Sequence, residues 1–269
     1  MEKALKMLDF FKVRTPGLIF LNQRKSGYFI PFFLFFSLLV SVNSGYGQVY
    51  PEWFLNPEKL HVSHAVAGYA DPAFYADSAV TQAYLNGCET FAKETTCQYS
   101  GGQFYWSTEI GVFWIGNDVQ EVFDSSATAL AKNVLVAADT FVTDKIVMVL
   151  ATNEPPSDDA SLFKLRKTRS KSSPDWIKEL PENSEFIYAT GLAPLYFHEK
   201  SSWLQAEQRA RHNLARTILL NVNSVQQSDV EGQDKRYEDL GITNINSRVV
   251  SRWFDPKDEI CHVLVKMKK

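Results

Sequence analysis

The feature that most constrains this fold is an internal repeat with a spacing of 123 residues. Several residues have an identical residue 123 positions further along the chain, and six such pairs carry the prediction. These pairs are Pro51 and Pro174, Trp53 and Trp176, Gly68 and Gly191, Ser78 and Ser201, Gln82 and Gln205, and Ala83 and Ala206. A constant spacing indicates two copies of one folding unit, so we expect two tandem domains, residues 48–154 and 174–269, within this 269-residue chain.

The clearest pattern in both copies is an amphipathic helix. In the second copy, apolar residues recur at three- and four-residue steps from Trp203 to Ile218, while Glu207 and Arg211 lie off this stripe. The same stripe in the first copy is Val80, Ala83, Gly87, Phe91 and Thr95, with Ser78 and Ser201 as expected N-caps. Small residues in both stripes indicate a helix that lies close to a sheet.

Short strands surround each helix. Residues 64–70 and 186–193 are apolar segments that contain a glycine and precede the helices. Each copy closes with two strand-like stretches joined by a turn, which predicts a β-hairpin. The stretches are 134–142 with 144–151, and 247–255 with 258–268. The predicted fold class is therefore α+β, with each repeat forming a small, mainly antiparallel sheet packed against one long amphipathic helix.

The copies differ most over residues 98–133 and 222–245, where we expect unit-specific binding. Residues 104–115 alternate as one long strand with a bulge at Gly111, and residues 226–239 are polar and predict a loop. Tyr105, Trp106 and Trp114 on that strand could form a platform for sugar rings or a partner protein. The alternative is that they pack beneath neighbouring segments.

Residues 155–173, between the copies, contain paired prolines, serines and a basic cluster, and predict an exposed linker. The basic residues could attract phosphate groups or acidic lipid, but a solvated linker also explains them.

The N-terminal 47 residues are typical of a signal peptide. A run of apolar residues from 29 to 42, interrupted by two serines, follows Arg24 and Lys25 and is short for a membrane span. Small residues end it, and a signal peptidase would cut between Gly47 and Gln48. The alternative is a short uncleaved anchor. We expect export to the periplasm, the outer membrane or the exterior.

Composition and motifs give little indication of chemistry. Residues 1–47 carry six basic and two acidic residues, so the rest has a net charge of −7 within a total of −3 and offers no electrostatic reason for a nucleic acid partner. The three cysteines, Cys88, Cys97 and Cys261, are expected to be small buried hydrophobic residues. No nucleophile, phosphate-loop or paired-cysteine motif is present, and no catalytic residue, metal or cofactor is predicted.

Several segments together resemble a known family. PEWFLNP at 51–57 and PDWIKELP at 174–181 match its leading motif, YATGLA followed by QAEQRARHNLAR its strand and helix, and VVSRWFDPKDEICHVLVKM its closing hairpin. The chain resembles the twenty-kilodalton bacterial surface lipoproteins, to which the N-terminal domain of flagellar assembly protein T is similar. The resemblance implies an envelope-associated, non-enzymatic domain. The lipidated cysteine of that family is missing here.

The sequence thus predicts an exported, non-enzymatic cell-envelope protein with a binding, scaffold or assembly role. An envelope protein or a polysaccharide is the expected partner, and membrane contact is expected only through an uncleaved N-terminal segment. Two alternatives remain open: an envelope-polymer hydrolase with a site between the repeats, and a carbohydrate-binding module that uses residues 104–115.

Overall fold

A computed structural model describes residues 48–108, 110–155, 161–167, 173–222, 235–239 and 242–269. The predicted cleavage site is only half visible, because Gly47 lies outside the described residues and Gln48 is the first of them. The described chain is a mixture of helices and small antiparallel sheets, which confirms the α+β class. None of its helices combines the length and the apolar character needed to cross a membrane.

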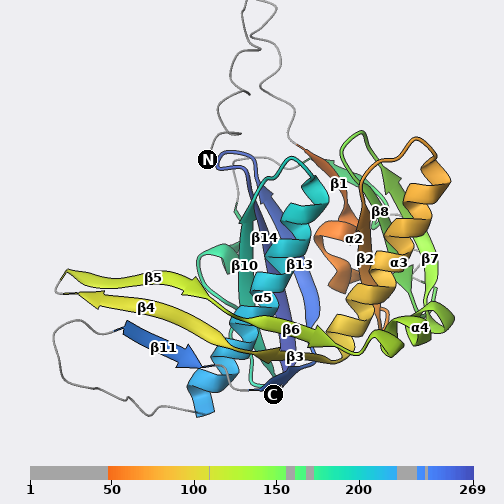
Figure 1. Ribbon diagram of the computed structural model, residues 1–269. Helices are drawn as coiled ribbons and strands as arrows, with labels where there is room; N and C mark the ends of the chain where they lie inside the picture. The colour runs from red at the N-terminus through yellow and green to blue at the C-terminus, as the bar shows by residue number, and fades with distance from the viewer. Residues whose placement is uncertain (1–47, 109, 156–160, 168–172, 223–234, 240–241) are drawn as a thin grey trace, which may run out of the picture. The chain divides into compact units, whose positions relative to one another are not determined.

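Two three-stranded antiparallel sheets carry the two long helices. The first sheet has the order β2 (Ala65–Ala70), β8 (Val147–Thr152) and β7 (Val136–Val142). The second has the order β10 (Phe186–Pro194), β14 (Ile260–Lys268) and β13 (Arg248–Asp255). Both predicted closing hairpins, β7–β8 and β13–β14, are confirmed. Helix α3 (Ala76–Thr95) packs on the first sheet and α5 (Glu199–Val222) on the second (Figure 1).

Small residues permit each helix to approach its sheet closely. A Cβ atom added to Gly68 would lie 1.9 Å from the carbonyl oxygen of Ala83, and one added to Gly191 would lie 2.2 Å from that of Ala206. No side chain larger than hydrogen fits at either strand position without moving the helix backbone. The two contacts are equivalent, because Gly68 and Gly191, like Ala83 and Ala206, are 123 residues apart. The apolar stripe of α5 is buried as predicted at Trp203.

The helices begin earlier than the sequence predicts. Helix α3 begins at Ala76 with Tyr75 at its N-cap position, and α5 begins at Glu199. Neither Ser78 nor Ser201 is therefore an N-cap. Both serines lie in the first helical turn, where serine is also tolerated, so the pattern of residue types did not locate the first residue.

The predicted single strand over residues 104–115 is instead a β-hairpin. Strand β4 (Gly102–Thr108) pairs antiparallel with β5 (Gly111–Asn117), and Thr108 lies opposite Gly111. Gly111 has φ 145°, a conformation that favours glycine, so this residue belongs to a turn and not to a bulge in one strand. Alternation continues through such a short turn, which is why the sequence pattern did not separate the two strands.

The predicted loop at 226–239 is also wrong in its last part. Residues Lys235–Asp239 form β11, which pairs with β4, and residues 226–234 lie outside the described part of the chain. Strand β12 (Thr243–Ile245) pairs with β3 (Cys97–Ser100), which also pairs with β6 (Gln120–Phe123). Segments from the two halves of the chain therefore build two shared sheets, at the positions where the sequence repeat fails.

Part of the predicted linker is also built into the fold. Strand β9 (Leu165–Lys167) pairs with β1 (Val49–Pro51), and the side chain of Leu162 is buried in the main core. The backbone N–H of Trp53 donates to the carbonyl of Leu162 at 2.9 Å. Residues 155–173 are thus not exposed throughout, because the leading segment of the first half needs a strand partner. Residues 156–160 and 168–172 lie outside the described part.

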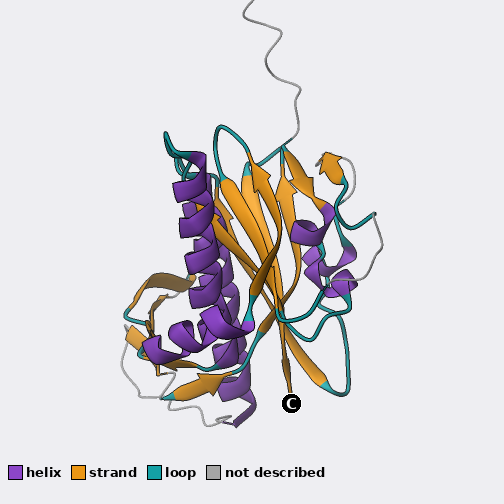
Figure 2. Ribbon diagram, turned by 90° about the vertical axis from the view of Figure 1, so that its right-hand side faces the viewer, coloured by secondary structure: helices purple, strands orange, loops and turns teal. Residues whose placement is uncertain are grey.

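One hydrophobic core connects the two halves. It contains the leading segment, with α2 (Glu52–Leu55) and η1 (Pro57–Leu60), together with the inner face of α5. The Phe54 ring contacts the Trp203 ring edge-on, with centroids 5.0 Å apart. Residues Gly47–Lys269 consequently form one compact unit and not two separate domains. Figure 2 shows the long helices on one side of the strands and short helical segments on the other.

The remaining helical elements are short. Helix α4 (Ser125–Val134) packs against α3, and Asp124 caps it by accepting a hydrogen bond from the Ser126 N–H at 2.8 Å. The 3₁₀ helix η2 (Asp175–Ile177) follows the linker and forms part of the site described next.

Candidate functional site

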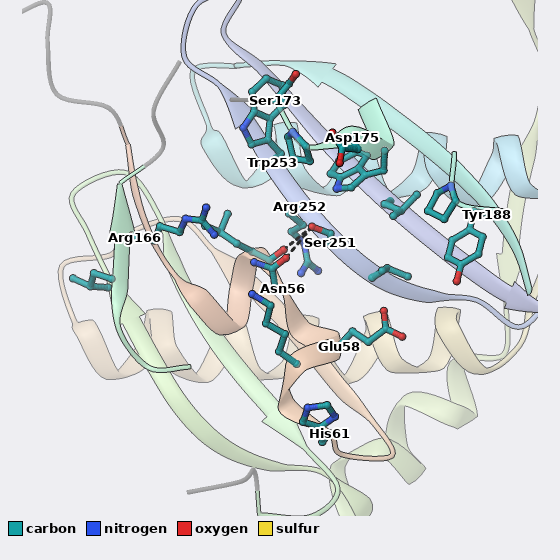
Figure 3. Close-up of a pocket in the computed structure, with 18 residues that line it drawn as sticks. Asn56, Glu58, His61, Arg166, Ser173, Asp175, Tyr188, Ser251, Arg252 and Trp253 are labelled. Carbon is teal, nitrogen blue, oxygen red and sulfur yellow. Dashed lines mark hydrogen bonds between the residues drawn. The ribbon is translucent and has the colours of Figure 1, made fainter. Parts of the chain in front are cut away.

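A cleft lies beside the second sheet, on the side away from α5. It has a volume of about 1160 Å³ and is bordered by segments of both halves (Figure 3). The leading segment supplies one wall through Asn56, Glu58 and His61, and β9 contributes Arg166. Strand β13 and helix η2 form the opposite wall. The cleft therefore exists only because the linker and the leading segment pack near the second sheet.

Hydrogen bonds fix the floor of this cleft. The Ser251 hydroxyl donates to the Leu55 carbonyl at 3.1 Å and lies 3.2 Å from the Asn56 amide oxygen. The β13–β14 register shifts between Val249 and Ser251, which marks a β-bulge at this point of the strand. The bulge and these bonds connect β13 to the end of α2 and hold the two walls at a fixed separation.

Three half-buried aromatic side chains line the second wall: Trp176 on η2, Tyr188 on β10 and Trp253 on β13. The Trp253 ring packs on the His262 ring with centroids 5.2 Å apart. Of the repeat pair Trp53 and Trp176, only Trp53 is fully buried, with its indole N–H 2.7 Å from Asp139. The second tryptophan is left partly open, facing the cleft.

Three charged side chains of the cleft, Glu58, Lys59 and Arg166, have ion-pair partners. Glu58 binds Lys266, and Glu52 lies 2.8 Å from Lys59 and 3.4 Å from Arg166. Partial burial acts to raise the pKa of Glu52, but the hydrogen bond and charge of Lys59, with a contribution from Arg166, hold it below its ordinary value. Figure 3 shows His61 and Asp175 at opposite ends of the cleft, so these titratable groups do not converge on one point.

A buried charge cluster lies deeper, between the halves. The Glu207 carboxylate on α5 accepts hydrogen bonds from the Tyr69 hydroxyl at 2.6 Å and from Arg252 Nη2 at 2.8 Å. Arg252 also donates from Nη1 to the Phe54 carbonyl at 2.9 Å. Strand β2, helix α5 and strand β13 are therefore joined through one carboxylate that is fully buried.

The cluster continues to the shared sheet. Arg211, one turn further along α5, lies 3.4 Å from Glu121 on β6 and 3.3 Å from the Tyr99 hydroxyl on β3. Glu94, at the end of α3, accepts from the Val249 N–H at 3.3 Å. Burial and the nearby Glu207 charge raise the pKa of Glu94 to about 7.

The sequence placed Glu207 and Arg211 off the apolar stripe of α5 and missed their burial. They are 0% and 3% exposed, because this side of α5 faces the first half of the chain. A signal was present in the spacing, since Trp203, Glu207 and Arg211 follow four-residue steps and so share one side of a helix. Charge type alone gave the opposite expectation.

The predicted aromatic site lies elsewhere. Tyr105 and Trp106 are on β4 and Trp114 is on β5; Tyr105 is paired with Trp114 in the register, and Trp106 with Phe113. The hairpin projects away from the two helix-covered sheets and lies outside the cleft (Figure 1). The structure therefore does not bring the three predicted residues to the cleft aromatics. Alternation in their strands could have placed Trp253 and Tyr188 on a face of the sheet, but not beside a cleft.

The cysteines are as expected. Cys88, Cys97 and Cys261 are free and buried, and burial is the largest cause that raises the pKa of each thiol. Within the described ranges, no group of three or more His, Cys, Asp or Glu side chains is arranged to hold a metal ion.

Comparisons with known proteins return no relative: no protein-family model, no curated protein and no solved structure matches this chain.

Proposed function

We propose that this chain is an exported, non-enzymatic cell-envelope protein that binds a polysaccharide of the envelope in the cleft beside the second sheet. In this proposal residues 1–47 are a signal peptide cut before Gln48, and the mature protein works in the periplasm, at the outer membrane or outside the cell. The resemblance to the surface lipoproteins supports an envelope location.

The observation that carries the proposal is the lining of the cleft. Trp176, Tyr188 and Trp253 present half-exposed rings along a wall that also offers polar groups, and sugar rings bind to such mixed aromatic and polar surfaces. Glu58, Lys59 and Arg166 are held in ion pairs and provide hydrogen-bonding groups at defined positions. Such a surface can orient a neutral polymer without carrying out a reaction on it.

The proposed origin of the fold is a duplication. The two sheets share one strand order, in which the first strand pairs with the last, and the last pairs with the one before it. Each sheet also has a bulge in the strand that begins the closing hairpin, between Ala137 and Asp139 in β7 and between Val249 and Ser251 in β13. Equivalent strand glycines also contact equivalent helix residues. Under this proposal the aromatic wall of the cleft belongs to the second repeat, whose leading tryptophan remained open.

Substitution of the cleft tryptophans tests the binding role. We expect Trp176→Ala and Trp253→Ala each to weaken co-sedimentation of the purified protein with insoluble envelope polysaccharide by about ten-fold, because one stacked ring contributes about 1 kcal/mol or more. Phe74→Ala is the matched control, since it removes an exposed ring outside the cleft. Equal binding by all three variants, or capture only of envelope proteins, would refute the proposal.

A hydrolase is the second candidate. It is favoured by the position of the cleft between segments of both halves and by His61, which adopts φ 54° beside Glu58. The hydrolase would be established if the wild-type protein releases new reducing ends from envelope polymer and the Glu58→Gln variant does not. Polymer that binds and stays intact supports the binding role.

A further inference from the structure

Two phenylalanine rings stand almost fully exposed at one end of the molecule. Phe74 lies in the loop between β2 and α3 and is 94% exposed; Phe197 lies in the loop between β10 and α5 and is 97% exposed. They are the two most exposed large hydrophobic side chains in the described ranges, and 123 positions separate them. Single exposed apolar residues are ordinary, but a matched pair at the same place in each half needs a reason.

The two loops are held together. The Asp71 carboxylate lies 2.6 Å from Lys200 Nζ and 3.2 Å from His198 Nδ1, so the loop before α3 contacts the loop and first turn of α5. Each exposed ring also packs edge-on against its neighbour in sequence: Phe74 against Tyr75 and Phe197 against His198, both with centroids 5.0 Å apart. The ion pairs of Asp71 therefore bring the two loops that carry the rings together, and residues 71–75 and 195–198 are called the aromatic end here.

The described chain also begins at this end. Gln48 Nε2 lies 3.5 Å from the carboxylate of Glu199, the first residue of α5, and the Tyr50 hydroxyl donates to the same carboxylate at 2.8 Å. Figure 1 shows β1 starting on the side where α3 and α5 begin. The apolar run 29–42 ends six residues before Gln48, a stretch that spans at most about 20 Å. Until the proposed cut before Gln48 is made, a membrane that holds this run is within reach of the aromatic end.

We infer that the aromatic end rests on a phospholipid surface, with the Phe74 and Phe197 rings in the interfacial layer. Aromatic rings favour this layer, and mobile chains of lipid can accept two separate rings without a shaped pocket. Acidic Asp71 and basic Lys200 neutralise each other beside the rings, which lowers the cost of bringing this end to the headgroups. This contact is independent of polysaccharide binding, because neither loop lines the cleft.

A lipid-quenching measurement tests the inference on the protein as cells produce it, which under the proposed function begins at Gln48. Ala73→Cys places a thiol in the exposed loop while Phe74 stays intact, and the three native cysteines are buried and do not compete for the dye. The labelled protein is mixed with vesicles of phosphatidylethanolamine and phosphatidylglycerol that contain nitroxide lipids. The same label is placed on a Phe74→Ser/Phe197→Ser background, and at Ile242→Cys beside β12, where the chain is also exposed.

The expected result is strong quenching at position 73, little at position 242, and at least about a ten-fold weaker vesicle affinity for the label on the double-serine background. Both substituted rings are exposed, so the variant is expected to fold normally. Equal quenching at positions 73 and 242 would overturn the inference. Equal quenching with and without the two rings would also overturn it, because another part of the protein would then explain the contact.

Discussion

At the scale of single residues, the most informative side chain is Glu94. Three carboxylates, from Glu94, Glu121 and Glu207, share a buried cluster with only two guanidinium groups, from Arg211 and Arg252. One negative charge is therefore without a cation of its own, and a proton on one carboxylate restores the balance. Burial and Glu207 raise the pKa of Glu94 to about 7, which makes it the residue that holds this proton.

This assignment predicts how stability varies with pH. The pKa of Glu94 is about 7 in the folded state and its ordinary value is 4.5, so between these values the folded state keeps a proton that the unfolded state has released. The contribution of Glu94 to stability is complete below pH 4.5 and falls by about 1.4 kcal/mol per pH unit up to pH 7. Glu94→Gln removes this dependence. The stability of the variant relative to wild type should therefore be higher at pH 8 than at pH 4.5.

Urea unfolding at a series of pH values measures this effect. Glu89→Gln is the matched control, since it removes a carboxylate from the exposed side of α3 that pairs only with Lys93. Parallel pH profiles for wild type and Glu94→Gln would show that Glu94 does not hold the proton.

A second prediction at this scale concerns the strand glycines. Gly191→Ala adds a Cβ atom 2.2 Å from the Ala206 carbonyl oxygen, and Gly68→Ala adds one 1.9 Å from the Ala83 carbonyl oxygen. Each should destabilise the protein by about 1–3 kcal/mol through overpacking, although alanine suits a strand better than glycine does. Thermal unfolding checks both, and Leu192→Ala on the exposed side of β10 should change stability much less. An unchanged unfolding temperature would mean that the helix can move away freely.

At the scale of elements, helix α5 is buried on two sides. Its apolar stripe packs on the second sheet, and Glu207 and Arg211 face the first half of the chain.

Glu207→Ala leaves both Arg252 and Arg211 without this carboxylate, and we expect the free energy of unfolding to fall by about 3–5 kcal/mol. Gln208→Ala, on the exposed side of the same helix, should cost less than about 0.5 kcal/mol. Chemical denaturation of the two variants compares the sides directly, and equal losses would contradict a two-sided helix.

The sequence predicted most elements that depend on local pattern. Helices α3 and α5 and the two closing hairpins follow from periodicity and turn residues, because these signals act over a few neighbouring positions. The failures involve long-range pairing. Strand β11 has the polar composition of a loop and forms a strand because β4 offers an edge, and β9 forms in the linker because β1 does. The cleft depends on these same distant contacts, so its aromatic wall could not be located in advance.

At the scale of the whole molecule, the shared core decides how the two halves unfold. Residues from the leading segment, α5 and β13 belong to one hydrophobic cluster, and the shared sheets add backbone pairing between the halves. Separation of the halves would expose this cluster. It would also leave Glu207, Arg211 and Arg252 without their hydrogen-bond and ion-pair partners in the first half of the chain. No half therefore has a complete core of its own.

The last prediction follows from this arrangement. Calorimetry should show a single unfolding transition in which the calorimetric and van't Hoff enthalpies agree, because neither half can unfold without opening the shared core. Glu207→Ala should lower the temperature of that transition without splitting it, since the apolar contacts of Phe54 with Trp203 still connect the halves. Two transitions in the wild-type protein would contradict the shared core. Two transitions in the variant alone would instead mean that the buried charges, and not the apolar contacts, couple the halves. Glu207 would then be the residue on which the cleft between the halves depends.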